Sequence, residues 1–437
     1  MTDCNTRHIR FSSLGRKYLL ADFTGEHITS DAGALLLREA DKRLRLTESL
    51  AKCITDPREQ DQLTHSVLRM LRQRIYGIAL GYEDLIDHAT LREDELFKIL
   101  AQSNETLAST PTLCRFENWI DRKSLVRMSI ALVETFIASF ATPPEELILD
   151  FDATDDPVHG KQELSFFHGY YDNYCFLPLY VFCGERLLVA YLRPSNIDAA
   201  KHSRAILKLL VKRFREVWPN VRIIVRGDSG FCRWETMRWC EKNRAGYIFG
   251  IARNAVLERL AWQLTERAKE EYERTKEKQR IFGEVRYAAQ TWDVERRVIV
   301  KAEHMEKGAN PRFVVTDLSG KAQYLYDEIY CQRGEMENRI KEQQLDLYAD
   351  RTSAHRFVAN QFRLLLASAA YVLVEHIRRV GLANTELADA QCGTIRLKLF
   401  KLGARIVKSV RRIVVHIASC YPYAQILRRV SERLVPC

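Results

Sequence analysis

Several motifs that would direct a functional assignment are absent from the sequence. It contains no P-loop, no nucleophile elbow and no H-E-x-x-H segment. Its 11 cysteines include no C-x-x-C pair, which disfavours a zinc ribbon. Their odd number also disfavours a disulfide framework and is typical of a protein from a reducing cytoplasm.

Long apolar runs are absent as well. No apolar stretch follows Met1, so we expect no signal peptide. The longest apolar run, from Leu364 to Val374, has 11 residues, whereas a membrane-spanning helix needs about 20. We therefore expect a buried helix at this run, a cytoplasmic protein and no membrane partner.

Positive charge is plentiful but unevenly placed. The 437 residues carry a net charge of +10, and the last 46 contain ten Lys or Arg and a single acid. A basic stripe of this kind favours a polyphosphate backbone as its partner; a solvated basic helix or an acidic protein partner is the alternative. We expect residues 385–437 to form a basic helical region that binds double-stranded DNA, with Arg411 and Arg412 among the contacts.

The first third of the chain has helical periodicity. Apolar residues recur at helical spacing from Gln62 to Ile78, and Ser109-Thr110-Pro111 is a typical helix start. We expect residues 1–140 to form a helical N-terminal domain for DNA binding. The pattern leaves open whether it contains a helix-turn-helix or is a plain bundle.

The pattern changes to alternating strands and helices after Glu146. Runs typical of strands cover 147–152, 176–182, 186–192, 221–225 and 245–251, and helical runs cover 199–217 and 234–243. The order βββαβαβ predicts an α/β fold with a mixed sheet flanked by helices. This order is that of an RNase H-like core.

The predicted core is interrupted before its last helix. Residues 255–324 contain a highly charged helix followed by strand-like runs, which we expect to form an insertion with its own sheet. Apolar residues return at helical spacing in 337–347 and 357–374. The predicted catalytic core therefore comprises residues 145–254 and 325–380, in the order βββαβαβα.

Three acids lie on or directly after elements of this predicted core. Asp152 ends the first strand, Asp228 follows the fourth, and Glu337 lies on the helix after the insertion. Carboxylates converging without His or Cys suit Mg²⁺, with Mn²⁺ as a substitute, and two such ions suit phosphodiester chemistry. Asp152 and Asp228 are also common turn residues, and Asp150 is the alternative for the first position.

The Glu337 helix carries further charged residues on the same face. Arg333, Glu337 and Lys341 recur at a spacing of four, so each lies one turn from the next. The alternative to a metal-binding role for Glu337 is an ion pair with Lys341 on a solvated surface.

At these residues the chain resembles bacterial insertion-sequence transposases of the DDE type, most closely the family numbered thirteen-eighty. The third acid of that group lies in a Tyr-x-x-Arg-x-x-x-Glu motif, which Tyr330, Arg333 and Glu337 match. Asp152-Ala-Thr154 and Asp228-Ser-Gly-Phe231 match the motifs of the first two acids. The segments 166–171 and 391–400 are also similar. The Lys that the group places seven residues after the Glu is replaced here by Gln344.

The resemblance implies cut-and-paste transposition at terminal inverted repeats. It implies Mg²⁺ held by the three acids, DNA contacts by Tyr330, Arg333 and Lys341, and a homodimer that pairs the two transposon ends in the nucleoid. Related enzymes stack an insertion-domain tryptophan on a flipped base, and Trp292 is the candidate here; a buried strand aromatic is the alternative. A nuclease without strand transfer, or a non-catalytic DNA-binding descendant, remains an alternative function, and a DNA hairpin intermediate remains open.

Overall fold

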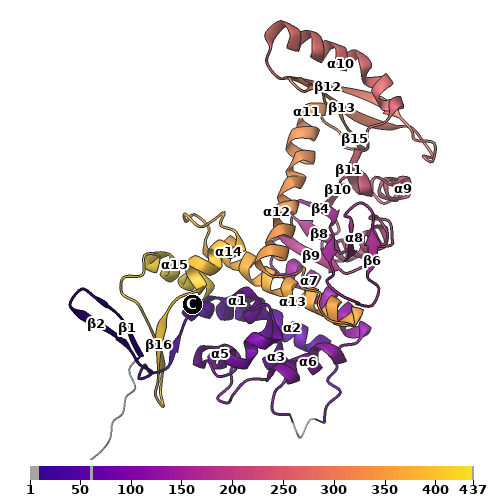
Figure 1. Cartoon of the computed structure of the whole chain (residues 1–437). Coiled ribbons are helices and arrows are strands. Elements are labelled where there is room, and N and C mark those ends of the chain that lie inside the picture. Colours follow the sequence, from indigo (N-terminus) through magenta and orange to yellow (C-terminus); the bar gives the residue numbers. More distant parts are fainter. Residues whose placement is uncertain (1–8, 60–62, 436–437) are drawn as a thin grey trace, which may run out of the picture.

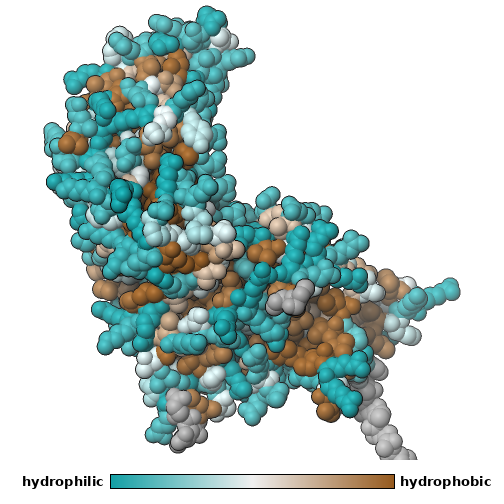
Figure 2. Space-filling model, turned by 180° about the vertical axis from the view of Figure 1, so that it is seen from behind, coloured by the Kyte–Doolittle hydropathy of each residue, from teal (hydrophilic) through white to brown (hydrophobic). Residues whose placement is uncertain are grey.

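The computed structural model describes residues 9–59 and 63–435. A helical body forms the base of the molecule, and a sheet-containing lobe rises from it to the helix α10 (Ala255–Thr275) at its far end (Figure 1). From behind, the upright lobe is largely hydrophilic at its surface, whereas apolar residues gather lower down (Figure 2). The charged insertion predicted from the sequence forms the top of this lobe.

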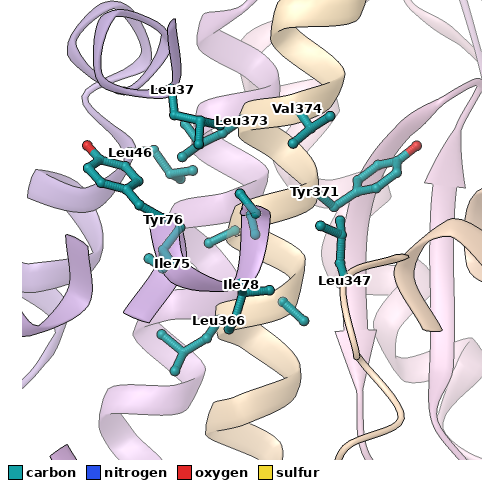
Figure 3. Close-up of a cluster of buried hydrophobic side chains, with 14 of the residues drawn as sticks. Leu37, Leu46, Ile75, Tyr76, Ile78, Leu347, Leu366, Tyr371, Leu373 and Val374 are labelled. Atoms are coloured by element: carbon teal, nitrogen blue, oxygen red, sulfur yellow. The ribbon is translucent and has the colours of Figure 1, made fainter. Parts of the chain in front are cut away.

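The helical body surrounds one long apolar helix. Ser66, Asp94 and Asp121 cap three of its helices through their side chains. In the central helix α13 (Phe357–His376), Leu373 lies next to Leu37 on the side of Leu46 and Ile75, whereas Tyr371 lies beside Leu347 on the opposite side (Figure 3). The main helices around it are α1 (Leu35–Leu44), α2 (Leu46–Cys53), α3 (Val67–Ala79), α5 (Glu95–Leu100), α6 (Thr110–Trp119) and α7 (Arg122–Ala138).

Helix α13 is the buried helix predicted at the apolar run. With the π-helical turn η8 (Ile377–Gly381) it forms a 25-residue segment that is long and apolar enough to cross a membrane. However, 78% of its most apolar window is buried inside the fold. Its apolar surface therefore serves as the centre of the largest hydrophobic cluster.

The N-terminal domain is predicted to be mostly helical, but its first elements are strands. Strands β1 (Ile9–Leu14) and β2 (Lys17–Ala21) form an exposed hairpin, and β3 (Ile28–Thr29) pairs with a C-terminal strand. Residues 9–14 alternate in hydrophobicity, and Gly15 adopts a left-handed φ of 59° at the turn. The helical periodicity begins only after this segment.

The sheet has the strand order β12-β13-β15-β11-β10-β4-β8-β9, with β14 (Gly308–Ala309) paired to β13. Strand β4 is central: β10 runs parallel to it, β11 parallel to β10, and β8 antiparallel to β4. The element order βββαβαβ predicted for 147–251 is present. The elements are β4 (Glu146–Ala153), β8 (Leu179–Cys183), β9 (Arg186–Tyr191), α8 (Ser203–Val217), β10 (Arg222–Gly227), α9 (Trp234–Lys242) and β11 (Gly246–Ile251).

Each face of the sheet has its own hydrophobic cluster. Leu149 and Phe151 of β4 pack with Phe214 of α8 and Met237 of α9. On the opposite face, β8 and β9 contact the helical body through residues such as Phe182, whose ring meets Tyr371 edge-on at 5.8 Å. The strands that carry the candidate acids are thus fixed from both sides.

The insertion extends the core sheet, so the prediction of a separate sheet is wrong. Strand β15 (Arg312–Thr316) pairs antiparallel with β11, and β13 (Arg296–Met305) and β12 (Gln279–Tyr287) continue outward. The long helix α10 (Ala255–Thr275) packs on these strands. Pairing with β15 covers β11, which would otherwise be an exposed edge strand.

The third candidate acid lies on an irregular helix after the insertion. This helix begins with α11 (Ala322–Tyr324) and includes π-helical turns at Leu325–Tyr330 and Glu342–Asp346. Between them, α12 (Gly334–Lys341) carries Glu337 and makes contacts with β4. The helix predicted for 337–347 is therefore present and starts earlier than the periodicity indicates.

The prediction of a helical C-terminal region is wrong for its middle part. Strands β16 (Ala404–Lys408) and β17 (Ile413–Ile417) form a hairpin, and β16 pairs with β3. Arg411 and Arg412 lie in the turn of this hairpin. The run Ile413-Val-Val is β-branched and favours a strand over a helix. Helical structure occurs on either side, at α14 (Cys392–Ile395) and α15 (Ala424–Leu434).

Candidate active site

Two of the candidate acids lie at the carboxyl ends of adjacent parallel strands. The pairing of β4 with β10 places Phe151 opposite Gly227, so Asp152 and Asp228 each follow at the next position. Asp228 caps the short 3₁₀ turn Ser229–Phe231, and its Oδ1 accepts a hydrogen bond of 2.8 Å from the Gly230 backbone N–H. The two carboxyl groups therefore reach the same edge of the sheet.

Arg333 links the third acid to the first. Its Nη2 lies 2.5 Å from Glu337 Oε1, and its Nη1 lies 3.5 Å from Asp152 Oδ2. The ion pair of Glu337 is therefore with Arg333, one turn before it, and not with Lys341. Lys341 is exposed and has no ion-pair partner within residues 9–59 and 63–435.

The electrostatics of Asp152 reflect this crowding. Burial raises the pKa of its carboxyl group to about 7, and the charge of Arg333 opposes the rise. The nearby carboxylates Asp228 and Glu337 act in the same direction as burial and contribute to this value. Burial therefore destabilises the charged form of Asp152, and a nearby cation stabilises it.

The alternative first acid, Asp150, has a different environment. Its side chain is 1% exposed and forms a bidentate ion pair with Arg226 of β10, where Arg226 Nη2 lies 2.7 Å from Oδ2. Arg226 also donates a hydrogen bond to the backbone carbonyl of Ile329. Both carboxylate oxygens of Asp150 are occupied by the guanidinium group, which leaves Asp152 as the acid at the sheet edge.

The chain matches the family described as transposase DDE domain group 1 over residues 11–437. The chain belongs to this family. Membership implies a nuclease or transferase that acts through a DDE domain. None of the curated proteins matches the chain.

Seven chains of solved structures are similar to this member of the DDE transposase family. One of them, a cryo-EM structure of a piggyBac transposase synaptic complex with hairpin DNA, is 11% identical in sequence, with a TM-score of 0.44. The alignment covers 85% of this chain and 79% of that chain.

Divalent metal ions are typical of DDE transposases, and the donor set here is suited to them. Asp152, Asp228 and Glu337 offer only carboxylate oxygens, the ligands that Mg²⁺ and Mn²⁺ prefer. Among the residues that the structure describes, no three acids, histidines or cysteines are gathered as a complete metal site. The Arg333 guanidinium lies between Asp152 and Glu337 and holds them through ion pairs, so metal binding would replace at least one of these contacts.

Tyr330 lies in an open cleft of about 280 Å³ beside Asp228. A Cβ atom at Gly250 of β11 would lie 2.5 Å from the Tyr330 hydroxyl, so the ring rests directly on the glycine backbone. The neighbouring charge of Asp228 contributes to raising the Tyr330 pKa, after burial. Of the residues predicted to contact DNA in this transposase, Tyr330 and Arg333 therefore lie at the acids.

Trp292 lies in an adjoining cleft of about 420 Å³, together with Trp234 and Tyr287. Its ring meets Tyr287 edge-on at 5.4 Å, and the Arg296 guanidinium lies 5.7 Å from its centroid. Both clefts are lined by Ser229, next to Asp228. Trp292 is partly buried against the sheet but remains at the rim of this second cleft.

Arg226 is the functional-site residue that the sequence interpretation missed. It contacts β4 next to Asp152, lies two residues before Asp228 and binds the backbone just before Tyr330. The sequence contains a signal for this ion pair, because an aspartate and an arginine on apolar strands each precede a candidate acid by two residues. Arg411 and Arg412 lie on the C-terminal hairpin, apart from the acids.

Proposed function

We propose that the chain is a DNA transposase that moves an insertion sequence by a cut-and-paste reaction at its terminal inverted repeats. The observation that carries this proposal is the placement of Asp152, Asp228 and Glu337. Two acids end adjacent parallel strands, and the third lies on a helix joined to the first by Arg333. Family membership and the RNase H-like order of the core strands support it.

The proposed reaction has two chemical stages. Water attacks the phosphorus of a phosphodiester at the transposon end, the bond to the 3′-oxygen breaks, and a free 3′-hydroxyl is left. That hydroxyl then attacks a target phosphodiester, forming a new phosphorus–oxygen bond while the target's own 3′-oxygen leaves. Bound Mg²⁺ or Mn²⁺ would activate the attacking oxygen and stabilise the leaving one.

The residues of the chain have separate tasks in this scheme. Asp152, Asp228 and Glu337 would hold the metal ions. Arg333 would be released to bind a phosphate, because a guanidinium is suited to phosphate oxygens in a bidentate contact. Tyr330 would contact the DNA beside Asp228, and the exposed Lys341 would contact the backbone further along the helix. Trp292 is proposed to stack on a displaced base.

The proposed partners are double-stranded transposon ends and target DNA. A homodimer in the synaptic complex would bring the two ends together, and the reaction would take place at the nucleoid in the cytoplasm. The basic C-terminal hairpin with Arg411 and Arg412 is proposed to bind the phosphate backbone.

A strand-transfer assay tests the function. Labelled DNA with the repeats that flank the gene is incubated with the full chain and Mg²⁺, and cleaved and joined products are separated. We expect both products, and a loss on the order of 10²-fold or more for Asp228→Asn and Glu337→Gln, since metal ions supply several kcal/mol of transition-state stabilisation. Cleavage without joining would indicate a nuclease, and binding without cleavage would indicate a non-catalytic descendant.

A further inference from the structure

A small hairpin inserted between β4 and β8 carries an unusual number of exposed aromatic rings. Strands β6 (Phe166–His168) and β7 (Asn173–Phe176) pair antiparallel, and His168 faces Asn173 across a four-residue turn. Asp172 has a left-handed φ of 54°, and its N–H donates to the His168 carbonyl at 2.9 Å. The turn is therefore hydrogen-bonded and holds Tyr170 at its apex.

The rings on this hairpin are organised but largely uncovered. Tyr170 is 85% exposed, Tyr174 59% and Phe167 53%. Phe167 and Tyr174 pack edge-to-face at 5.7 Å, and Tyr170 meets Tyr171 at 4.9 Å. A set of ordered aromatic rings that faces solvent marks an interaction surface.

The hairpin is attached to the strand that carries Asp152. Strand β7 pairs with β5 (Asp156–Pro157), which begins four residues after Asp152, and Asn173 Nδ2 donates to Asp155 Oδ2 at 3.2 Å. Burial, with the charges of Asp155 and Asp152, raises the pKa of Tyr171 to about 12. The aromatic surface therefore begins at the first candidate acid.

The chemistry and the position of this surface suit nucleobases. Its exposed side chains are aromatic, with hydroxyl groups on Tyr170 and Tyr174, whereas Leu164 is the one large aliphatic side chain exposed among residues 159–176. Flat rings with polar edges stack on bases of any sequence, and stacking requires bases that are not enclosed in a duplex. Protein interfaces are rich in aromatic residues too, so the position of the rings beside the first candidate acid is what favours bases here.

We propose that the β6–β7 hairpin stacks on unpaired DNA bases next to the phosphodiester that is cleaved, with Tyr170 and Tyr174 as the contacting rings. The inference rests on the proposed function, which places that phosphodiester at Asp152. The hairpin would hold the strands apart at the cleavage site, while the three acids hold the metal ions.

Binding of forked and fully paired DNA tests the proposal. The full chain carrying Asp228→Asn is titrated into two labelled DNAs of the same end sequence, one paired throughout and one with three unpaired bases at the cleavage site, and fluorescence anisotropy is measured. We expect tighter binding of the fork by about tenfold per stacked base. Adding Tyr170→Ala and Tyr174→Ala should remove this preference and leave duplex binding unchanged.

Two controls make the result specific. Tyr324→Ala removes a tyrosine of similar exposure (55%) on α11 and should leave the fork preference intact. Tyr170→Phe with Tyr174→Phe keeps the rings and should retain it. Equal binding of fork and duplex by the parent, or an unchanged preference in the double alanine variant, overturns the proposal.

A change from dimer to monomer in the double alanine variant, with fork binding unaffected, would overturn it too and assign the hairpin to protein contacts. Failure of the proposed function would be seen separately, as absence of cleavage by the wild-type chain on either DNA.

Discussion

Arg226 and Asp150 form a buried bidentate ion pair between the two strands that end in the candidate acids. Arg226 Nη2 lies 2.7 Å from Asp150 Oδ2, and the same guanidinium binds the Ile329 carbonyl on the chain that leads to Glu337. A single side chain thus contacts all three segments that carry the acids. A planar group with donors in fixed directions defines relative positions better than a flexible ammonium does.

Replacing Arg226 with Lys should therefore impair catalysis more than its charge suggests. The variant keeps the positive charge but loses the planar guanidinium that binds Asp150 through two nitrogens. We therefore expect cleavage to fall about 10- to 100-fold, since small misplacements of reacting groups have effects of this size. The matched control is Arg222→Lys on the same strand, whose exposed ion pair with Glu146 spans 3.1 Å. That control should retain its activity and change the free energy of unfolding by less than about 1 kcal/mol. Equal rates for the two variants would contradict the role of Arg226.

Asp150 and Asp152 should fail in different ways when each is changed to Asn. Asp150→Asn leaves the Arg226 charge buried and uncompensated, so the free energy of unfolding should fall by about 3–5 kcal/mol. Asp152→Asn removes a carboxylate whose charge burial already disfavours, so at pH 8 stability should be unchanged or higher while cleavage is lost. Thermal unfolding and the cleavage assay on both variants check this. A stable, inactive Asp150→Asn would reassign the first acid.

The contact between Gly250 and Tyr330 predicts a pair of coupled effects. In Gly250→Ala the new methyl group would lie 2.5 Å from the Tyr330 hydroxyl, so the ring must move and cleavage should fall. Tyr330→Phe removes that oxygen, and the nearest ring carbon is then 3.4 Å from the methyl group. The double variant should therefore lose less activity than the two single effects combined. Additive losses in a double-mutant cycle would show that the two positions are not coupled.

The acids could be placed from the sequence because each follows a strongly patterned element. Leu147, Leu149 and Phe151 alternate up to Asp152, and Val221–Val225 directly precedes the glycine turn of Asp228. Strand ends are visible in such patterns. Glu337 is harder to place from the sequence, because its helix carries charged residues and contains π-helical turns that shift the apolar period.

Strand pairing and the details of the site could not be predicted in the same way. The continuous apolar run Phe313–Val315 marks β15 as a strand but does not indicate its partner, and only the fold shows that β15 pairs with β11. In the C-terminal region the many Lys and Arg residues suggest a basic helix, but the β-branched run that starts at Ile413 favours a strand and determines the local structure. The choice of Arg333 over Lys341 as the partner of Glu337 depends on side-chain directions in a packed helix.

The C-terminal hairpin should contribute to DNA binding through charge. Arg411 and Arg412 lie at its exposed turn and have no acidic partner among the residues that the structure describes. Changing both to Gln should weaken binding and reduce the slope of log K against log salt by about 0.9 for each phosphate that the variant no longer neutralises. The variant for comparison, Arg428→Gln with Arg429→Gln on α15, removes the same amount of positive charge outside the hairpin. An unchanged salt slope in the hairpin variant would show that the hairpin does not bind the phosphate backbone.

The buried His376 predicts how stability depends on pH. Burial, together with the smaller effect of the neighbouring cations Arg379, Arg43 and Arg186, lowers its pKa to about 3. In the unfolded chain a histidine has a pKa of about 6.5, so below that pH the unfolded state binds a proton that the folded state does not. The stability contribution of the neutral ring is therefore complete above pH 6.5. It decreases by about 1.4 kcal/mol per pH unit as the pH falls from 6.5 toward 3.

Denaturant unfolding of the wild-type chain and His376→Gln at pH 7 and pH 5 isolates this contribution. Other groups titrate in both proteins, so the difference between their pH dependences belongs to His376. We expect the wild type to lose about 2 kcal/mol more than the variant between the two pH values, because the unfolded histidine is protonated at pH 5 and glutamine is not. His376 is the last residue of α13, the helix at the centre of the helical body, so this loss should appear in the cooperative unfolding of that body. Parallel pH dependences for the two proteins would mean that His376 binds its proton in the folded state.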